Sequence, residues 1–204
     1  MSHIIKDMIE TRTSVSKFKS HIINQTEIEE MIRLATLAPS AYNFQNWKFI
    51  AVTSDEGKQI LSDAAYGQPQ VISASVTFII CGQLNAHRQL ADSLRSSVNE
   101  NIIPADIAQS WVEAANSTHE SDKGLQRDEA IRSASLAAMT LIYAAKSMGY
   151  ESGIMGGFDA SKVAQCFHLN ADDVPVMLVP VGKADEGNWP QKIRKPVSDV
   201  IRYA

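Results

Sequence analysis

The sequence predicts a single α+β domain, because strand patterns alternate with helical patterns and no dinucleotide-binding motif is present. Three apolar segments have strand character: Trp47 to Thr53, Ser75 to Cys81 and Val174 to Val181. The longest helical pattern, Asp128 to Met148, is apolar around most of its circumference and must therefore be enclosed. No GxGxxG follows a strand, which argues against a βαβ unit that binds a dinucleotide. A chain of 204 residues can bury a full core without disulfides.

The N-terminal region predicts two helices before the first strand. The first should run from about His3 to Thr11, where the chain becomes polar. The second should begin at Thr26, which can form a capping box with Glu29, and should continue to the stop at Pro39.

The middle of the chain is mostly helical. Asp55 to Ala65 predicts a short helix, and Asn85 to His119 predicts two helices separated by Pro104. His119 to Gly124 is expected to form a solvated loop. The many alanines of the following long helix, Ala138 among them, predict close contact with a second subunit, and the alternative is a core helix of a monomer.

The C-terminal region predicts one more helix and a tail. Asp159 to Phe167 should be a helix capped by Asp159, and it precedes the final core strand. Gly187 to Ala204 is expected to be a polar C-terminal arm. No internal repeat or linker appears, so residues 1–204 are expected to form one domain.

Composition indicates a cytoplasmic protein. The net charge of -4 gives no general attraction to nucleic acid or to an anionic membrane. Lys6, Asp7 and Glu10 interrupt any signal-peptide core. Cys81 and Cys166 stand alone, which fits a reducing compartment.

Common catalytic motifs are absent. The chain has no GxxxxGK[ST], HExxH or GxSxG, and its histidines have no metal-ligand spacing. We therefore expect no metal site and no catalytic side chain. Chemistry, if present, should be carried by a bound organic cofactor.

Ala38 to Phe49 (APSAYNFQNWKF) is the most informative segment. It places the hydroxyl of Ser40 and the amides of Asn43 and Gln45 between a helix stop and a strand. Such groups both donate and accept hydrogen bonds, as the edge of a flat heterocycle requires. The alternative, a polar surface loop anchored by Trp47, stays open.

Two basic clusters and a glycine pair are further candidates. Arg12 is followed by Thr13 and Ser14, and Lys192 and Arg194 lie near the C-terminus. Arginine together with hydroxyl groups suits a phosphate, although each cluster alone also fits a solvated surface. The sequence GIMGGFD, residues 153–159, lets the backbone approach a ligand closely, or simply forms a tight turn.

Together these motifs resemble the FMN-dependent nitroreductase family. RTSVSKF, APSAYNFQNWKF, SASVTFIICG, MGYESGIMGGFD and VPVGKADEGNWPQKIRKP occur in the family's order over nearly the whole chain. The sequence is most similar to the small bacterial branch of NAD(P)H nitroreductases. The resemblance implies a three-layer α-β-α sandwich with a central, mostly antiparallel sheet and helices on both faces. It also implies an intertwined homodimer with FMN at the subunit interface.

The resemblance implies a role for each candidate residue. Arg12, Ser14, Lys192 and Arg194 would hold the phosphate and ribityl chain of FMN. Pro39, Ser40 and Asn43 would come from the other subunit and pack over the flavin, with Gln45 supporting that loop. The Gly156 and Gly157 backbone would face flavin N5 and O4, and Gln70, or Gln68, would reach the pyrimidine edge. The full implied cofactor-binding set is Arg12, Thr13, Ser14, Ser16, Pro39, Ser40, Asn43, Gln45, Gln70, Met155, Gly156, Gly157, Lys192 and Arg194.

The chain departs from the family pattern at four of its positions. Thr13 replaces a common arginine, Ser16 a basic residue, Gln70 a lysine, and Asn46 the proline before the tryptophan. Positive charge near flavin N1 and O2 is therefore reduced, which leaves the reduction potential and the preferred acceptors open.

The resemblance implies a ping-pong oxidoreductase. Hydride would pass from NADH or NADPH through flavin N5 to a small planar nitroaromatic or quinone, with residues 85–124 covering the substrate pocket. The alternatives are a flavin sensor or storage protein with little turnover, or another flavin reaction on this fold, such as dehydrogenation, dehalogenation or flavin cleavage. A flavin-free interaction domain is a further alternative.

Overall fold

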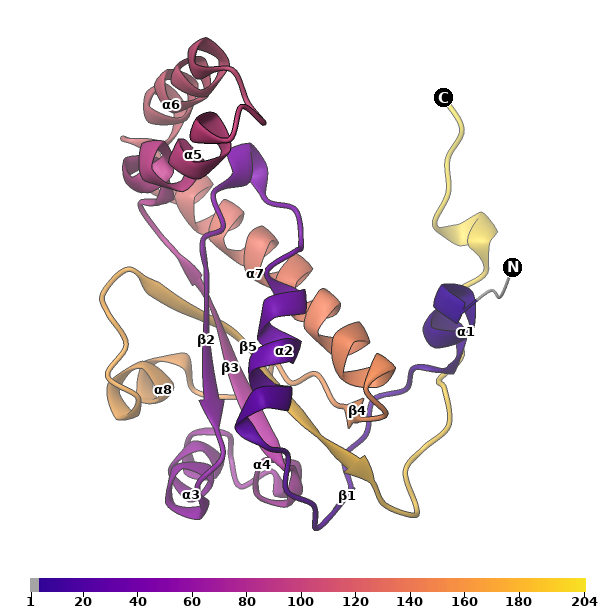
Figure 1. Ribbon diagram of the computed structural model, residues 1–204. Helices are drawn as coiled ribbons and strands as arrows, with labels where there is room; N and C mark the ends of the chain where they lie inside the picture. The colour runs from indigo at the N-terminus through magenta and orange to yellow at the C-terminus, as the bar shows by residue number, and fades with distance from the viewer. Residues whose placement is uncertain (1–3) are drawn as a thin grey trace.

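The computed structural model describes residues 4–204, so the predicted start of the first helix at His3 lies outside the described residues (Figure 1). The α-helices are α1 (Ile4–Thr11), α2 (Gln25–Ala35), α3 (Asp55–Ala64), α4 (Pro69–Ser73), α5 (Leu90–Asn99), α6 (Ala105–His119), α7 (Lys123–Ser147) and α8 (Ala160–Cys166). The strands are β1 (Phe18–Lys19), β2 (Trp47–Val52), β3 (Val76–Gln83), β4 (Glu151–Ser152) and β5 (Asp173–Ala184). Short 3-10 turns are η1 (Ala41–Asn43), η2 (Ala86–Gln89) and η3 (Val197–Asp199).

The central sheet has the strand order β1-β5-β3-β2, and β4 pairs with β5 beside this path. Each pairing is antiparallel, as predicted. The register aligns Trp47 with Gly82 between β2 and β3, and Val76 with Val181 between β3 and β5. The predicted strands are confirmed with small shifts at their ends, whereas the short β1 and β4 carried no sequence signal.

Helices cover both faces of the sheet, which confirms the three-layer prediction. Phe78 and Ile80 of β3 pack into one cluster with α2 and α7. Ile79 and Cys81, which alternate with them, pack into a second cluster with α3, α4 and α8. Successive side chains of a strand point to opposite faces, so β3 supplies both cores.

The long helix α7 begins at Lys123, earlier than the predicted Asp128, because Asp122 caps it by accepting a hydrogen bond from the Leu125 N–H. The predicted contact between the alanines of α7 and a second subunit requires a correction. Ala138 is 1% exposed and packs in the core of its own chain, so it does not offer a free surface to a second subunit. Leu136, which is 41% exposed, lies on a part of α7 that the chain leaves uncovered.

Two further expectations need correction. The capping box of α2 lies two residues earlier than predicted, with Asn24 and Glu27 exchanging the reciprocal hydrogen bonds instead of Thr26 and Glu29. His119 ends α6 and is buried, so the solvated loop shrinks to the residues between α6 and α7. An aromatic ring cannot remain in solvent where the neighbouring helices pack over it.

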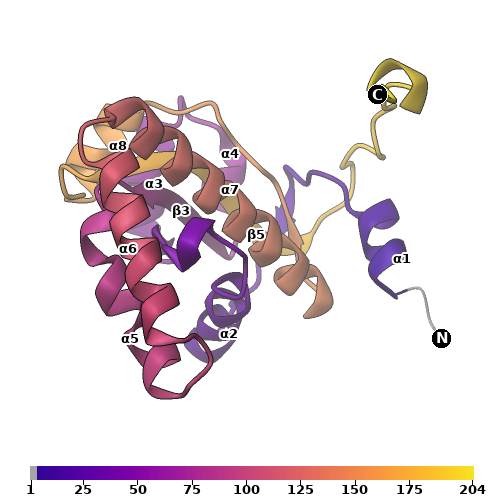
Figure 2. The ribbon, with the colours of Figure 1, turned by 90° about the horizontal axis from the view of Figure 1, so that it is seen from above.

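The α5–α6 pair forms a satellite at one end of the sheet, with its own apolar cluster around Phe44, Leu90, Leu94 and Ala115. The two helices are separated at Pro104, as predicted. The satellite lies where β2 begins and β3 ends in Figure 1, and it lies apart from α1 and the C-terminus in Figure 2.

Helix α1 and the C-terminal arm lie beside each other, away from the sheet (Figures 1 and 2). The arm is not simply polar, which corrects the prediction for residues 187–204. Exposed apolar side chains include Ile5 of α1, at 75%, and Ile193 and Val197 of the arm, at 99% and 70%. Such a concentration of exposed apolar side chains indicates a contact surface.

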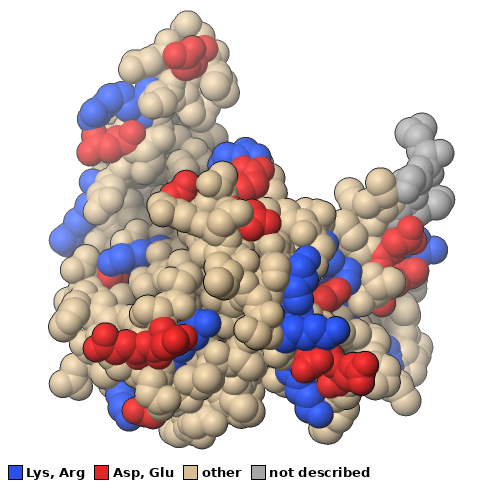
Figure 3. Space-filling view, turned by 60° about the horizontal axis from the view of Figure 1, so that its bottom comes forward, with Lys and Arg blue, Asp and Glu red and all other residues tan. Residues whose placement is uncertain are grey.

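Charged side chains of both signs are interspersed on the face shown in Figure 3. No helix within residues 4–204 combines the length and the apolar character needed to cross a membrane.

Candidate functional site

A first cavity, the Ser14 cavity, has a volume of about 210 Å³ and is formed by four separate parts of the chain. These parts are the segment after α1, helix α4, the turn after β4 and the C-terminal arm. Its lining residues are Ser14, Val15, Ser16, Gln70, Gly153, Ile154, Met155, Trp189 and Lys192. The structure thus brings together five members of the predicted set: Ser14, Ser16, Gln70, Met155 and Lys192.

The floor of the Ser14 cavity depends on a close backbone approach. The Val15 N–H donates to the Ser152 carbonyl at 3.0 Å. A Cβ at Gly153 would lie 2.3 Å from the Val15 carbonyl oxygen. Since real Cβ atoms do not approach backbone oxygens so closely, this position requires glycine.

Asn188 fastens the root of the arm to the segment after α1. Its Oδ1 accepts from the N–H groups of Ser16 and Lys17 at 2.8 and 3.0 Å. Its Nδ2 donates to the carbonyls of Lys17 and Asp185, both at 2.9 Å. Sequence reasoning missed Asn188 and the adjacent Trp189, although both lie in a quoted motif. An asparagine flanked by glycine and tryptophan was the available signal.

The predicted cationic groups have no acidic partners. Within residues 4–204, Arg12, Lys192 and Arg194 form no ion pair. Lys192 Nζ lies 5.3 Å from the ring centroid of Trp189. The Arg194 guanidinium donates to the Lys192 carbonyl and to the Gln191 side chain. Arg12, Thr13 and Arg194 are near the lining residues in sequence but do not line the cavity themselves.

The glycine turn offers free backbone donors. Within the described residues, the N–H groups of Gly156 and Gly157 have no hydrogen-bond partner, and both residues are exposed. No atom lies within 4 Å of a Cβ built at Gly156. The Gly157 carbonyl accepts from Gln68 Nε2 at 2.6 Å, and Gln68 Oε1 accepts from Gln70 Nε2 at 3.0 Å. Gln68 and Gln70 therefore form one chain of amides beside the turn.

A second cavity, the Ser40 cavity, holds the predicted loop residues and has a volume of about 670 Å³. Pro39, Ser40, Tyr42 and Asn43 line it, together with Ser97, Ile102, Ile103 and Trp111 from the α5–α6 satellite. Its residues are not part of the Ser14 cavity within one chain.

The loop at the Ser40 cavity has an unusual backbone. Tyr42, Asn43 and Gln45 have φ values of 51°, 61° and 51°, in the left-handed region. The Gln45 N–H donates to Ser40 Oγ at 2.9 Å and closes the loop. Strained backbone of this kind is frequent at ligand sites.

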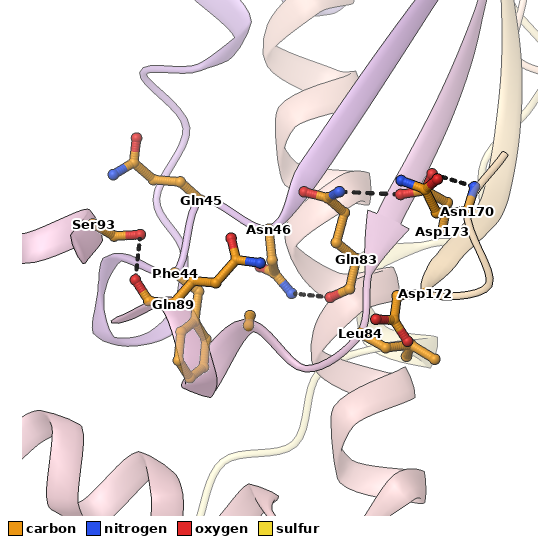
Figure 4. A pocket seen from close by; sticks show the side chains of 11 residues that line it. Phe44, Gln45, Asn46, Gln83, Leu84, Gln89, Ser93, Asn170, Asp172 and Asp173 are labelled. Carbon is orange, nitrogen blue, oxygen red and sulfur yellow. Dashed lines mark hydrogen bonds between the residues drawn. The ribbon is translucent and has the colours of Figure 1, made fainter. Parts of the chain in front are cut away.

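A third cavity, the Gln45 cavity, has a volume of about 410 Å³ and lies between the start of β2, the start of α5 and the start of β5 (Figure 4). Gln45 lines this cavity and neither of the other two. The buried Asp173 accepts from Lys48, Gln83 and the Asn170 N–H. These partners outweigh its burial and lower the pKa of Asp173, so this carboxylate is a satisfied structural group.

Two titratable groups, Cys81 and Tyr150, have raised pKa values. Burial raises the pKa of the Cys81 thiol to about 12, which keeps it protonated. Burial, followed by the hydrogen bond to Glu27, raises the pKa of Tyr150 to about 12. Neither residue lines the three cavities. In the part of the chain that the structure describes, no three His, Cys, Asp or Glu side chains converge as a metal site.

Comparisons with known proteins agree with this architecture. A model described as the nitroreductase family matches residues 9–183. YodC of Bacillus subtilis, provisionally named an NAD(P)H nitroreductase, is 36% identical over 198 residues, which cover 97% of this chain and 97% of that protein. An oxygen-insensitive NADPH nitroreductase of Helicobacter pylori is 28% identical over 209 residues, covering 97% of this chain and 95% of that protein. A provisionally named nitroreductase of Exiguobacterium sibiricum, solved in complex with FMN, has a TM-score of 0.90 and 28% identity, with 98% of this chain and 96% of that chain covered.

Proposed function

Since this chain belongs to the nitroreductase family, we propose that it is an FMN-dependent oxidoreductase that takes electrons from NAD(P)H and passes them to a nitroaromatic or quinone acceptor. Bound FMN would supply the redox chemistry at its N5 atom, in a ping-pong sequence that admits donor and acceptor in turn. The proposal includes a cytoplasmic location, as the composition suggests.

The Ser14 cavity is the observation that carries the proposal. Lys192 is the charged side chain among its lining residues, and Arg12 and Arg194 are close to the lining in sequence. Within residues 4–204 the hydroxyls of Ser14 and Ser16 have no hydrogen-bond partner. Unpaired cations and free hydroxyl donors are what a phosphate and a ribityl chain require. The residues present therefore fit FMN.

The glycine turn would bind the ring of the cofactor. The free N–H groups of Gly156 and Gly157 can donate to flavin N5 and O4, and the open space at Gly156 leaves room for the ring. Gln70 would hydrogen-bond to the pyrimidine edge, with Gln68 holding it in place. No side chain of this chain is needed as a nucleophile, so its work is positioning.

We further propose that the functional unit is a homodimer with two shared sites. Pro39, Ser40 and Asn43 lie at a different cavity from Ser14 and Lys192, so one chain alone does not assemble the whole predicted set. The exposed apolar side chains of α1 and the arm support an intertwined contact. In a dimer, the Ser40 cavity of one subunit would face the cofactor bound by its partner.

The α5–α6 satellite, which lies within residues 85–124, would cover the substrate pocket. Ile102, Ile103 and Trp111 line the Ser40 cavity together with Tyr42, and none of them is charged. Apolar and aromatic walls favour a flat, uncharged acceptor.

The visible spectrum of the purified protein tests the proposal, before and after anaerobic addition of NADPH. We expect a yellow protein that NAD(P)H bleaches and that oxidises NAD(P)H continuously when menadione or nitrofurazone is added. A yellow protein without turnover would favour a flavin sensor or storage protein. A colourless protein after expression with riboflavin would refute the proposal.

A further inference from the structure

Two buried hydrogen-bond acceptors line a small void that shares Phe44, Asn46 and Gln83 with the Gln45 cavity. Asn46 and His119 are 4% and 6% exposed. Asn46 Oδ1 and His119 Nε2 have no hydrogen-bond partner in the described part of the chain. Both residues line the same void of about 10 Å³, together with Phe44, Gln83, Asn85, Ala86, Gln126 and Glu129. A buried acceptor without a donor costs about 1–3 kcal/mol, so the pair requires an explanation.

The orientation of the Asn46 amide follows from its neighbour. Its Nδ2 donates to the Gln83 carbonyl at 3.2 Å, as the dashed line in Figure 4 shows. Because a carbonyl can only accept, the amide cannot be turned without losing this bond. Oδ1 is therefore the atom left without a donor.

The tautomer of His119 follows in the same way. Its Nδ1 lies 3.1 Å from the Ala115 carbonyl, which can only accept. Thr118 Oγ1 lies 2.8 Å from the same nitrogen, but its hydroxyl proton is donated to the Ala114 carbonyl at 2.9 Å. Both neighbours thus require the proton on Nδ1, which leaves Nε2 as a bare acceptor.

Two acceptors cannot bond to each other, and the other polar side chains at the void are engaged. Gln126 donates to the His119 carbonyl, Gln83 to Asp173, and Asn85 to Asp172. The Glu129 carboxylate accepts from Arg132. The unmet demand is for one small molecule with two donors.

We propose that one internal water molecule occupies this void and donates one hydrogen bond to Asn46 Oδ1 and the other to His119 Nε2. A void of about 10–15 Å³ is sufficient for a single water molecule. The water joins the last residue of α6 to the residue before β2. The His119 ring also contacts Phe44 at a centroid distance of 5.2 Å, so the bridge supports the loop between them.

The bridge depends on two side chains of this chain, Asn46 and His119. It requires neither a cofactor nor a second subunit, and its test is independent of the proposed activity.

Crystallography at high resolution and nitrogen NMR test the site directly on the full-length protein. We expect ordered water density within hydrogen-bond distance of both atoms, and a His119 ring protonated on Nδ1. An empty void, a reoriented Asn46 amide bonded directly to His119, or a proton on Nε2 would each overturn the proposal.

A double-mutant cycle tests the energetic link. Asn46→Leu keeps the shape of the side chain, and His119→Phe keeps its ring contacts. Each single variant should raise the unfolding equilibrium constant measured in urea. In the double variant, the fold-increase of this constant should be about threefold to tenfold smaller than the product of the two single fold-increases. The control pairs Asn46→Leu with Leu61→Val, because Leu61 is buried in the cluster on the other face of the sheet and does not line the void. Equal coupling in both cycles, or none in the first, would refute the bridge.

Discussion

At the scale of single residues, Gly153 and Gly157 have different surroundings, and we expect the first to matter for folding and the second for ligand binding. A Cβ at Gly153 would collide with backbone, whereas a Cβ at Gly157 would meet only the Gln68 side chain at 3.4 Å. Gly153 is thus required by the fold, and Gly157 leaves a space that a ligand could use.

We predict that Gly157→Val lowers FMN content and reduction by NAD(P)H while leaving the urea midpoint nearly unchanged. Gly153→Ala should instead destabilise the protein by about 1–3 kcal/mol, because the segment after α1 must move. Anaerobic reduction rates and urea unfolding measure the two effects. Normal FMN content and normal reduction in Gly157→Val would contradict the assignment.

The unpaired cations should anchor the phosphate of FMN. A charge-assisted hydrogen bond contributes roughly 1.5–3 kcal/mol, so Arg12→Ala and Arg194→Ala should each weaken FMN about ten- to a hundredfold. Titration of the apo-protein with FMN measures this. Lys19→Ala serves as the control, since Lys19 lies in β1 and does not line the Ser14 cavity. Unchanged affinity in both arginine variants would refute the anchor.

Gln70 should limit how easily the cofactor is reduced. Gln70→Lys adds a positive charge at the Ser14 cavity. A favourable interaction of about 1 kcal/mol with the added charge of the reduced cofactor would raise its two-electron potential by about 20 mV. Gln70→Met, which is neutral, is the matched control in a spectroelectrochemical titration. Equal potentials in the lysine and methionine variants would contradict the prediction.

At the scale of elements, Glu120 ties η2 to the end of α6. It binds Arg88 at 2.6 Å and His87 at 2.8 Å. The hydrogen bond from Arg88, followed by the one with His87, lowers the pKa of Glu120 from 4.5 to about 2. The ion pair therefore stabilises the fold above the unfolded pKa of 4.5 and is lost as the pH falls through about 2.

We predict that Glu120→Gln increases amide hydrogen exchange in α6 at neutral pH, with little change in α7. The difference in urea stability from the parent protein should narrow as the pH falls from 4.5 towards 2. Glu100→Gln is the control, because Glu100 caps α5 without an ion pair in the described residues. A constant difference across this pH range would show that the charge is unimportant.

Much of the fold followed from the sequence. The helix caps at Asp159, the break at Pro104 and the apolar strands gave signals within a few residues. The family resemblance, which rested on five ordered motifs, is confirmed by the family model. The capping box of α2 was misplaced because two acidic residues stand at the same spacing from two possible caps.

The site was less accessible to sequence reasoning. The residues of the Ser14 cavity come from distant segments, and Asn188 joins them through backbone hydrogen bonds that no local pattern reveals. The burial of His119 and Ala138 depended on how the helices pack, which periodicity alone does not fix.

At the scale of the whole molecule, apolar side chains are exposed on α1 and the arm, while the central strand β3 is buried along almost its whole length. A monomer would carry this surface in contact with water, which is unfavourable. A dimer would bury it and complete both cofactor sites.

We predict that changing Ile193, Val197 and Val200 together to serine releases monomers that keep the secondary structure but lose FMN. Sedimentation velocity, circular dichroism and flavin absorbance measure these effects. The control is Ile107→Ser on α6, which should remain dimeric with its flavin. A parent protein that sediments as a monomer while holding FMN and turning over NAD(P)H would refute the dimer requirement.

The hydrogen bonds by which Asn188 fastens the arm to the segment after α1 have a consequence for how such a protein can change over evolutionary time. The arm beyond Asn188 contributes no buried residue to the core of its own chain. Substitutions there are not constrained by the packing of the single chain, so they are selected mainly for their effect on ligand and partner. New specificities should therefore arise first in the arm, without loss of the scaffold.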